Sequence, residues 1–378
     1  MTRPLESYRA LFPVLQEQLY FNHAGVAPTS LRAAEAVRGW MEDLVHHGIR
    51  HERGWEAHCE RIRALAARLL NAEPGEMAFV RNTSHGLGLV AEGLDWKPGD
   101  EVAVATSLEY PSNVYPWQHL ADRGVVVREI EAPSGGVTVE AVAQALTPRT
   151  KLVAVSSVQF GTGVRTDLEA VGALCEKAGV LFCVDAIQSV GCVPVDVKKC
   201  RIHFLSADSH KWMLGISGIG VLYVAKEVLP RVRPVLVGWR STTDAWNFNR
   251  THFELRPDAA KFEEGSAAYP GLYALGAALE LLQEVGVENI EVRIKELLAR
   301  LEKGLVELGC EVGPTPALRA GILTFLPPGA NVRALGAYLA EHHVAHSVRR
   351  GRIRLSPHFY NLPEEMDRLV ELVRGFGG

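Results

Sequence analysis

The chain lacks long apolar runs, a strong charge of either sign and closely paired cysteines. Its longest uncharged stretch, about 14 residues from Trp212 to Ala225, is too short and too rich in glycine to span a bilayer. The formal net charge of −4 provides no basic field for nucleic acid or an anionic membrane. Residues 1–25 interrupt their apolar positions with charges and have no signal-peptide core. We therefore expect a cytoplasmic protein that binds neither nucleic acid nor membrane.

Cysteine and histidine give little indication of a metal site. None of the six cysteines belongs to a C-x-x-C pair. Cys59 and Cys175 lie in helical patterns and Cys183 in an apolar strand, where cysteine behaves as a small hydrophobic residue. We expect no acidic or cysteine residue at the spacing of a metal ligand from the histidine-rich segments VHHGIRH (45–51) and EHHVAHS (341–347). We expect structural cysteines and no bound metal.

Between residues 77 and 224, short β-branched runs alternate with segments of helical spacing. The expected strands are 77–80, 101–105, 125–130, 151–157, 180–185 and 220–224. Segment 167–179 shows the helical spacing best, with Leu168, Val171 and Cys175 on one stripe. Asp167 can cap its start and Gly179 its end. This alternation predicts an α/β fold with a mostly parallel sheet flanked by helices.

After residue 260 the pattern changes to long helical segments, short strands and a final helix. We therefore expect two domains. The larger α/β domain would span residues 16–260. The smaller α+β domain would span residues 261–378 and include residues 1–15.

Residues that follow the expected strands define a candidate pocket, because ligands of parallel sheets bind at the carboxyl ends of the strands. NTSHGLG follows 77–80, and EYPSN follows 101–105 after a short gap. Asp185 ends 180–185, and DSHK follows the apolar segment 203–207. Hydroxyls, glycines, an aromatic ring, a carboxylate and a lysine together outline a pocket for an aromatic phosphate ester.

The segment NTSHGLG has two interpretations. Thr83 and Ser84 begin a helix whose free amides attract a phosphate, or they serve as an ordinary helix cap. The pattern from Gly86 to Ala91 is also a partial dinucleotide fingerprint, with Glu109 near the position of a ribose-binding acid. A nicotinamide-dependent oxidoreductase is therefore an alternative, although that interpretation gives Lys211 no role.

Lys211 lies in SADSHKWMLG, between two apolar strands. A cation there costs free energy unless it is paired, reaches water or is neutral because chemistry requires it. Asp185 directly ends an apolar strand, so it needs a cationic or hydrogen-bonding partner, or it caps the following segment. Tyr110 either packs against neighbours or faces the ligand.

In combination these motifs resemble the class V aminotransferase family of enzymes that depend on pyridoxal 5′-phosphate (PLP), which have fold type I. VDAIQSVG and SADSHKWMLGISGIGVLYV carry the resemblance, and NTSHGLG, EYPSNVYPW, FEEGSAAYPG and RIRLSPHFYN extend it over nearly the whole chain. Within the family the chain resembles the isopenicillin N epimerase-like and cysteine desulfurase-like branch. The resemblance implies PLP as cofactor, an amino acid as substrate and a homodimer with shared active sites.

The resemblance also implies roles for individual residues. Lys211 would form the Schiff base with PLP and then act as general base. Asp185 would pair with the pyridine nitrogen, and Tyr110 would stack on the ring. Arg354 would clamp the substrate carboxylate, with Asn22 and His23 nearby. The remaining implied cofactor contacts are Thr83, Ser84, the amide of His85, Gln188 near the 3-oxygen, Asp208, His210, and Gly265 and Ser266 at the phosphate of the neighbouring subunit.

Departures from the family pattern bear on the reaction. Desulfurases of the family carry a nucleophilic cysteine on a loop shortly before the carboxylate-binding arginine, whereas VAHSVRRGRIRLSP (344–357) contains none. Asp208 stands where some relatives have a serine. We therefore expect an aminotransferase or an epimerase, with a PLP-dependent carbon–sulfur lyase or cysteine desulfurase as the alternative. The aromatic segment 237–249 forms a wall of the pocket or a packed surface loop.

Overall fold

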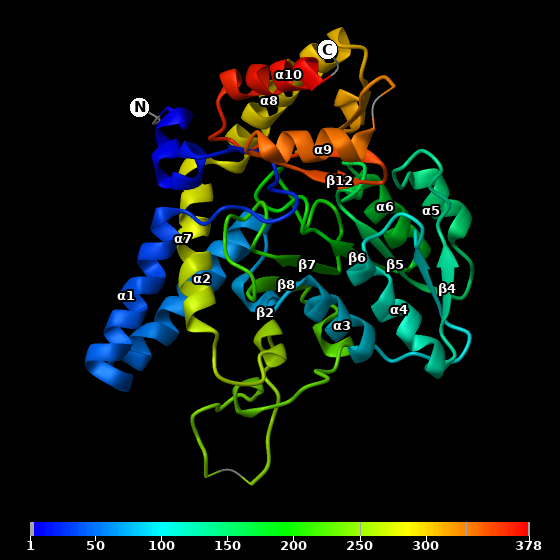
Figure 1. Ribbon diagram of the computed structural model, residues 1–378. Helices are drawn as coiled ribbons and strands as arrows, with labels where there is room; N and C mark the ends of the chain where they lie inside the picture. The colour runs from blue at the N-terminus through cyan, green and yellow to red at the C-terminus, as the bar shows by residue number, and fades with distance from the viewer. Residues whose placement is uncertain (1–3, 250, 330, 377–378) are drawn as a thin grey trace.

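A computed structural model describes residues 4–249, 251–329 and 331–376 (Figure 1). Its centre is a seven-stranded sheet with the order β2-β8-β7-β6-β5-β3-β4. Its strands are β2 (Met77–Val80), β3 (Glu101–Val104), β4 (Val126–Glu129), β5 (Thr150–Ser156), β6 (Leu181–Asp185), β7 (Phe204–Asp208) and β8 (Gly220–Val224). Both ends of the six expected strands lie within one residue of the observed bounds, and β7 corresponds to the apolar segment 203–207, which is not among them; the predicted α/β fold is confirmed.

The direction of the strands brings their carboxyl ends to one edge. β3, β4, β5, β6 and β7 pair in parallel, whereas β8 is antiparallel to both β7 and β2. β2 therefore runs in the same direction as β7, and only β8 is reversed. As a result, the segments that follow β2, β3, β5, β6 and β7 all emerge at the same edge of the sheet.

Helices between the strands pack against this sheet. They are α3 (Thr83–Gly93), α4 (Tyr115–His119), α5 (Val139–Ala145) and α6 (Leu168–Ala178). The Asp167 side chain accepts a hydrogen bond from the Ala170 amide at the start of α6. Gly179 adopts a φ of 67° at its end, a left-handed conformation that favours glycine. Both ends of α6 therefore follow the signals predicted from the sequence.

Three longer helices lie side by side beyond the β2 edge of the sheet. They are α1 (Leu31–His47), α2 (Glu52–Leu70) and α7 (Tyr269–Val285), and α7 packs against both of the others (Figure 1). The short 3₁₀ turn η3 (Gly48–His51) joins α1 to α2. Among the described helices, none combines the length and apolarity needed to cross a membrane.

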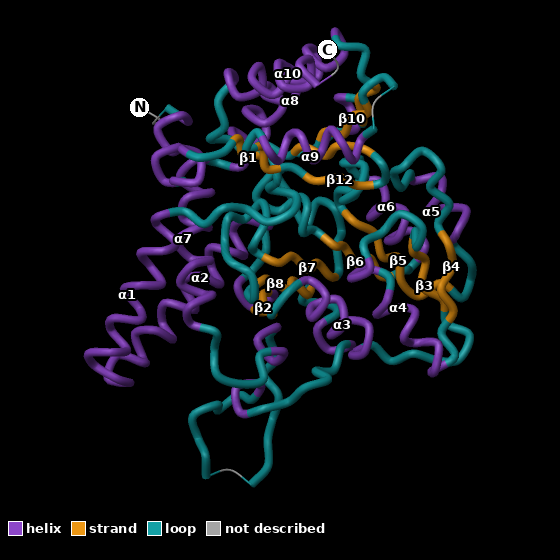
Figure 2. Tube along the Cα trace, viewed as in Figure 1, coloured by secondary structure: helices purple, strands orange, loops and turns teal. Residues whose placement is uncertain are grey.

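A second sheet lies above the first in the view of Figure 2. It has the order β12-β13-β10-β9 and is antiparallel throughout. Its strands are β9 (Glu311–Gly313), β10 (Leu323–Leu326), β12 (Ser347–Arg349) and β13 (Arg352–Leu355), and its helices are α8 (Val287–Glu307), α9 (Val332–Glu341) and α10 (Pro363–Phe376). The two-stranded pair β1 (Leu19–Tyr20) and β11 (Val344–Ala345) joins the N-terminal segment to this part. The division into domains at residue 260 stays a prediction.

Short 3₁₀ helices complete the described elements. They are η1 (Leu5–Leu11), η2 (Pro13–Gln16), η4 (Pro74–Glu76), η5 (Pro111–Asn113), η6 (Leu120–Arg123), η7 (Leu229–Arg231), η8 (Trp239–Ser241), η9 (Ala259–Phe262) and η10 (Pro316–Leu318). Phe12, between η1 and η2, stacks on Tyr360 with 3.8 Å between the ring centroids. The two ends of the chain therefore pack against each other.

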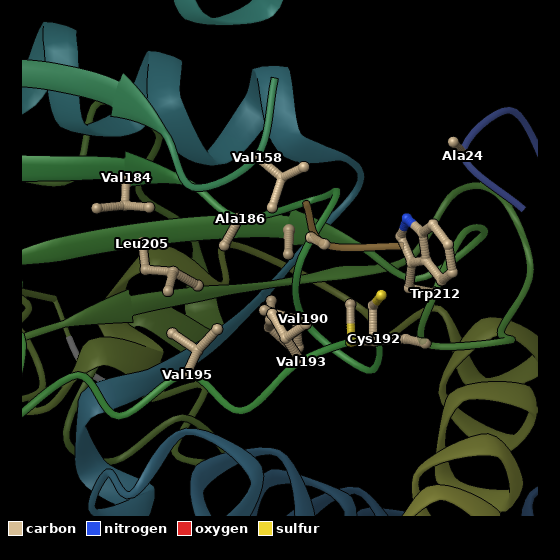
Figure 3. Close-up of a cluster of buried hydrophobic side chains, with 14 of the residues drawn as sticks. Ala24, Val158, Val184, Ala186, Val190, Cys192, Val193, Val195, Leu205 and Trp212 are labelled. Atoms are coloured by element: carbon tan, nitrogen blue, oxygen red, sulfur yellow. The ribbon is translucent and has the colours of Figure 1, made fainter. Parts of the chain in front are cut away.

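A continuous apolar core supports the carboxyl edge of the large sheet. Figure 3 shows a cluster of buried side chains that includes Val184 of β6, Leu205 of β7, Cys192 and the indole of Trp212. These side chains are buried, and Trp212 directly follows Lys211 in the sequence. The backbone at Lys211 is therefore anchored by a large buried side chain.

Candidate active site

A cavity of about 270 Å³ opens at the carboxyl edge of the large sheet. Segments from both sheets and from the N-terminal region surround it. It is lined by Ala24, Gly25, Asn82, Thr83, Ser84, Tyr110, Ser112, Phe160, Asp185, Ile187, Gln188, Asp208, His210, Lys211, Arg349 and Arg354. Nine of the residues proposed from the sequence therefore meet in one place, although they come from five separate segments of the chain.

Asp185 and Lys211 form the electrostatic centre of this cavity. The Asp185 side chain is almost completely buried, and one oxygen accepts a hydrogen bond of 3.0 Å from the Ile187 amide. Burial raises the pKa of Asp185 to about 7. Burial also lowers the pKa of Lys211 to about 8, against the opposing effect of Asp185. A neutral amine is therefore accessible at Lys211 near neutral pH.

The start of α3 forms one wall of the cavity. Asn82 is the cap, because its side-chain oxygen accepts a 2.8 Å hydrogen bond from the amide of His85. The amide of His85 thus already has a partner, and its expected contact with the phosphate stays a prediction. The first-turn amides of a helix have no intrahelical acceptor, so those of Thr83 and Ser84 suit an anion. The Ser84 hydroxyl lies 2.6 Å from that of Ser112 and adds polar groups to this wall.

Other polar groups frame the same wall. The Thr83 hydroxyl accepts a 3.0 Å hydrogen bond from the amide of Asp208, which ties α3 to the end of β7. His210 Nδ1 lies 3.0 Å from Asp208 Oδ1. Neither of these two buried atoms has a hydrogen bond of acceptable geometry to any described residue, so both can orient toward a bound ligand.

Aromatic side chains border the opening. The Tyr110 ring lies 5.9 Å from Lys211 Nζ and meets Phe160 edge to face at 5.1 Å. About half of the Tyr110 side chain is exposed, so one ring face is free to stack on a planar ligand. Phe160 follows β5, and no pattern in the sequence distinguishes it from a core residue.

Two arginines project from the second sheet. Arg354 on β13 is buried, and its guanidinium donates hydrogen bonds of 3.0 Å to Ser347 Oγ and 2.7 Å to the Phe160 carbonyl. Burial, followed by the charge of Arg349, lowers the pKa of Arg354 to about 9. Arg349 is exposed and also lines the cavity, a position that the sequence motifs did not indicate. The cavity therefore has two guanidinium groups in its wall that can bind a carboxylate.

His23 and Asn22 do not line the cavity. His23 is completely buried, with Nδ1 2.8 Å from the Ser356 carbonyl and Nε2 hydrogen-bonded to Tyr360. Burial lowers its pKa to about 4. The ring of His23 connects the N-terminal segment to the residues after β13, and the expected position of Asn22 and His23 near the substrate stays a prediction. Ala24 and Gly25 occupy the cavity wall instead.

Gly265 and Ser266 lie outside the cavity of their own chain, as judged from the described residues that line it. Ser266 is exposed and Gly265 is partly buried. Their expected contact with a neighbouring subunit stays a prediction. Segment 237–249 is also separate: it lies on a projecting arm, where Trp239 packs edge to face on Trp246 at 4.9 Å (Figure 1).

The dinucleotide interpretation does not fit this geometry. Glu109 is buried and accepts hydrogen bonds from Asn113, Ser156 and Gln159, so it has no free carboxylate for a ribose. The strand before Gly86 is β2, which lies at the edge of the sheet and pairs only with the reversed strand β8. A dinucleotide fingerprint requires a parallel βαβ unit at this point.

The cavity fits PLP. A helix start suits its phosphate, Asp185 suits its ring nitrogen, Tyr110 suits its ring face and Lys211 suits its aldehyde. The buried Asp208 Oδ1 and His210 Nδ1, without hydrogen-bond partners of good geometry among the described residues, are consistent with a missing polar ligand. The fold and this constellation together define a fold-type-I enzyme that depends on PLP.

Comparison with known proteins identifies the family. The family model described as Aminotransferase class-V matches residues 19–369, so the chain belongs to this family. A Pyrococcus abyssi protein named probable cysteine desulfurase is 33% identical over 98% of both chains. The apo structure of a cysteine desulfurase from Thermococcus onnurineus NA1 superimposes with a TM-score of 0.91 at 28% identity, covering 100% of this chain and 98% of that one.

A third relative, C-DES, has been solved in two informative forms. One holds glycine covalently linked to its PLP cofactor, with a TM-score of 0.90, 27% identity and coverage of 96% and 98% of the two chains. The other is described as the cystine C–S lyase C-DES with its reaction product, cysteine persulfide, with a TM-score of 0.88, 27% identity and coverage of 95% and 98%. These findings confirm the predicted cofactor. They favour sulfur chemistry over the aminotransferase or epimerase that we placed first.

Proposed function

We propose that this enzyme is a PLP-dependent carbon–sulfur lyase that eliminates a sulfur leaving group from the β-carbon of an amino acid. The observation that carries the proposal is a cavity with lysine, aspartate and arginine but no cysteine among its lining residues. Relatives named cysteine desulfurase and cystine C–S lyase support the substrate class. The lysine, aspartate and arginine suffice for elimination, whereas transfer of sulfur to the protein requires a thiolate.

The cysteines of this chain are unsuited to accept sulfur. Five of the six are buried, and Cys200 is half-buried beside a different cavity that includes Ser157 and Ser189. Burial raises the pKa of Cys59 and Cys175 to about 12 and also raises that of Cys200. A thiolate, which is the nucleophilic form, is therefore scarce at every one of these positions near neutral pH.

The turn between β12 and β13 is too short to form a loop that carries a nucleophile. β12 and β13 pair from Arg349 to Arg352, so only Arg350 and Gly351 lie between them. Both have positive φ values, 48° and 73°, as a tight two-residue hairpin requires. This hairpin lies where the family resemblance places the cysteine-bearing loop of desulfurases.

Each residue of the cavity has a defined task in the elimination. Bound PLP supplies a ring that accepts the electron pair released at the α-carbon. Lys211 Nζ, once neutral, takes the α-proton as general base. Asp185, once ionised, would hold a proton at the ring nitrogen, and Arg354 would hold the substrate carboxylate. The Cβ–S bond then breaks, its electron pair leaves on sulfur, and water converts the remainder to pyruvate and ammonia.

Product analysis tests the proposal. The purified holoenzyme receives L-cystine, L-cysteine or S-methyl-L-cysteine, and pyruvate, ammonia, alanine, D-isomers and released sulfur species are measured. A lyase gives pyruvate and a persulfide or thiol, and it retains this activity in Cys200→Ser. Alanine as the main product would show a desulfurase. A keto acid formed only with an amino-group acceptor, or a D-isomer, would show the transaminase or epimerase that we first expected.

We also propose a homodimer in which Gly265 and Ser266 complete the neighbouring active site, a role supported by the family resemblance. Lys211→Ala and Gly265→Asp would each abolish activity. In a mixed dimer, one site would combine an intact Lys211 with an intact partner loop, so activity would return. Failure of the mixture to regain activity, with subunit exchange verified by mass spectrometry, would contradict shared sites.

A further inference from the structure

A cluster of metal-binding side chains lies far from the catalytic cavity, where α1 turns into α2. Asp43 Oδ1 is 2.9 Å from His47 Nδ1 and 2.7 Å from His51 Nδ1. The three ligand atoms all lie within 4.8 Å of one another. We propose that Asp43, His47 and His51 form a binding site for a divalent transition-metal ion of the Zn²⁺ type. The catalytic proposal and this one are independent.

The sequence contains a local signal for this site, which the expectation of no bound metal overlooked. We found no acidic partner for VHHGIRH, yet Asp43 precedes His47 by four residues and His51 by eight. Four residues is slightly more than one helical turn, so Asp43 and His47 project from the same face of α1. η3 continues the winding and brings His51 to the same point. Asp43 is therefore an acidic partner of this histidine segment, contrary to the expectation that it has none.

The geometry requires little rearrangement to admit an ion. Zinc binds histidine nitrogen and carboxylate oxygen at about 2.0–2.2 Å, which places tetrahedral ligand atoms about 3.3 Å apart. The present separations of 2.9 and 2.7 Å are those of hydrogen bonds from the imidazoles to the carboxylate. Replacement of these two hydrogen bonds by one cation therefore requires each imidazole nitrogen to move about half an ångström away from the carboxylate oxygen, while the two nitrogens already lie within 4.8 Å of each other.

The second oxygen of Asp43 is already oriented. Trp55 of α2 donates a hydrogen bond of 2.7 Å from Nε1 to Asp43 Oδ2. Trp55 is buried and packs against Trp40 and Tyr269, so its position is fixed. Ligand carboxylates in metal sites characteristically have such an outer hydrogen-bond partner.

Solvent can reach the remaining coordination positions. The side chains of His47 and His51 are 44% and 48% exposed, and that of Asp43 is 25% exposed. Two imidazoles and one carboxylate would therefore leave at least one position for water. Nitrogen and oxygen ligands of this kind favour zinc, cobalt, nickel or copper over magnesium or calcium, which prefer oxygen alone. A bound ion would also link the end of α1 to the start of α2.

Cobalt(II) titration of the PLP-loaded enzyme tests the site. We expect one Co²⁺ per chain, with visible d–d bands and without the near-ultraviolet charge-transfer band of a thiolate ligand. Asp43→Asn, His47→Gln and His51→Gln should each weaken Co²⁺ binding at least about tenfold, as even loss of an outer partner does in known sites. His46→Gln is the matched control, because His46 is exposed and belongs to the same segment but not to the cluster.

A second readout separates binding from a general effect on folding. Zn²⁺ should raise the melting temperature of the wild type and of His46→Gln, but not that of Asp43→Asn. The absorption band of bound PLP should stay the same in all of these variants, which shows that each is folded. Unchanged Co²⁺ affinity in Asp43→Asn and His47→Gln, or no binding by the wild type at a tenfold excess of Co²⁺, would overturn the proposal.

Discussion

Trp212 Nε1 donates a hydrogen bond of 2.9 Å to Gln188 Oε1, and Gln188 Nε2 donates one of 3.0 Å to the Ala24 carbonyl. One buried amide thus connects the residue after Lys211, the turn after β6 and the N-terminal wall of the cavity. The family resemblance places Gln188 near the 3-oxygen of PLP. Since both ends of its amide already have protein partners, Gln188 is also a positioning residue for Lys211.

Substitution of Gln188 tests this positioning role. Gln188→Met keeps the approximate volume but leaves the buried Trp212 N–H without an acceptor, which costs about 1–3 kcal/mol of unfolding free energy. Gln188→Glu keeps that acceptor and should lose less. Urea unfolding measures the stability, and the absorption band of bound PLP reports whether Lys211 is displaced. Equal stability of Gln188→Met and wild type would show that the amide network contributes nothing.

Arg349 should tune the reactivity of Lys211. Its positive charge lowers the pKa of both Lys211 and Arg354, so Arg349→Met should raise both pKa values. Lys211 reacts when neutral, and its pKa of about 8 predicts that PLP capture by the apoenzyme speeds up as pH rises toward 8. In Arg349→Met this rise should shift to higher pH.

Arg350→Met is the control for this experiment. The Arg350 guanidinium donates a hydrogen bond to the Ser107 carbonyl, and Arg350 does not belong to the cavity lining. Its pH profile for PLP capture should therefore match the wild type. Stopped-flow absorbance measures the capture rate, and identical profiles for Arg349→Met and wild type would contradict the electrostatic role of Arg349.

The buried imidazole of His23 should make the enzyme sensitive to acid. Its pKa is about 4 in the folded chain against an ordinary value of 6.5, because burial disfavours the charged form. The unfolded chain therefore takes up this proton first as pH falls. The free energy of unfolding therefore receives the full contribution of the neutral His23 imidazole above pH 6.5. It should fall by roughly 3 kcal/mol as the pH decreases from 6.5 to 4.

Urea unfolding at several pH values measures this acid sensitivity. The free energy of unfolding should fall less steeply between pH 6.5 and 4 in His23→Gln than in wild type. His119→Gln serves as the control, because the His119 side chain is 75% exposed. A slope in His23→Gln equal to that of wild type would show that other groups cause the acid sensitivity.

Two glycines of α3 should respond in opposite ways to alanine. A Cβ on Gly86 would lie 2.2 Å from Ser206 Oγ, whereas a Cβ on Gly88 would meet nothing within 4 Å. Gly86→Ala should therefore cost about 1–3 kcal/mol of stability through overpacking against β7. Gly88→Ala should add about 0.5–1 kcal/mol by favouring the helix. Thermal unfolding distinguishes the two, and a stable Gly86→Ala would contradict the close approach of α3 to β7.

The sequence predicts those features of the molecule that are set by residues close together in the chain. β6 is a continuous buried run, so its bounds and its terminal Asp185 follow from apolar residues alone. The role of His23 could not be predicted in this way, because its surroundings come from Ser356 and Tyr360, more than 300 residues away. Glu109 resembled a ligand-binding acid for the same reason: the groups that bind its carboxylate assemble only in the folded sheet.

The residues missed at the site show the same limit. Phe160 follows β5 and Arg349 ends β12, where neither periodicity nor spacing marks a residue as facing the cavity. Asp43 differs from them, since its spacing to His47 is local and visible in the sequence. It was missed because the partner of the histidine segment lies one helical turn upstream, outside the run of histidines itself.

The two-residue turn between β12 and β13 also bears on where sulfur goes after it leaves the substrate. A thiol on a mobile loop would carry sulfur as a covalent cargo to a docked acceptor. Without such a carrier, a proposed lyase product would leave by diffusion and react with whichever thiolate it meets first. Delivery of sulfur would then depend on the concentration of small thiols around the enzyme. Because the short hairpin carries no cysteine, sulfur would pass to any thiol in solution and not to one docked acceptor.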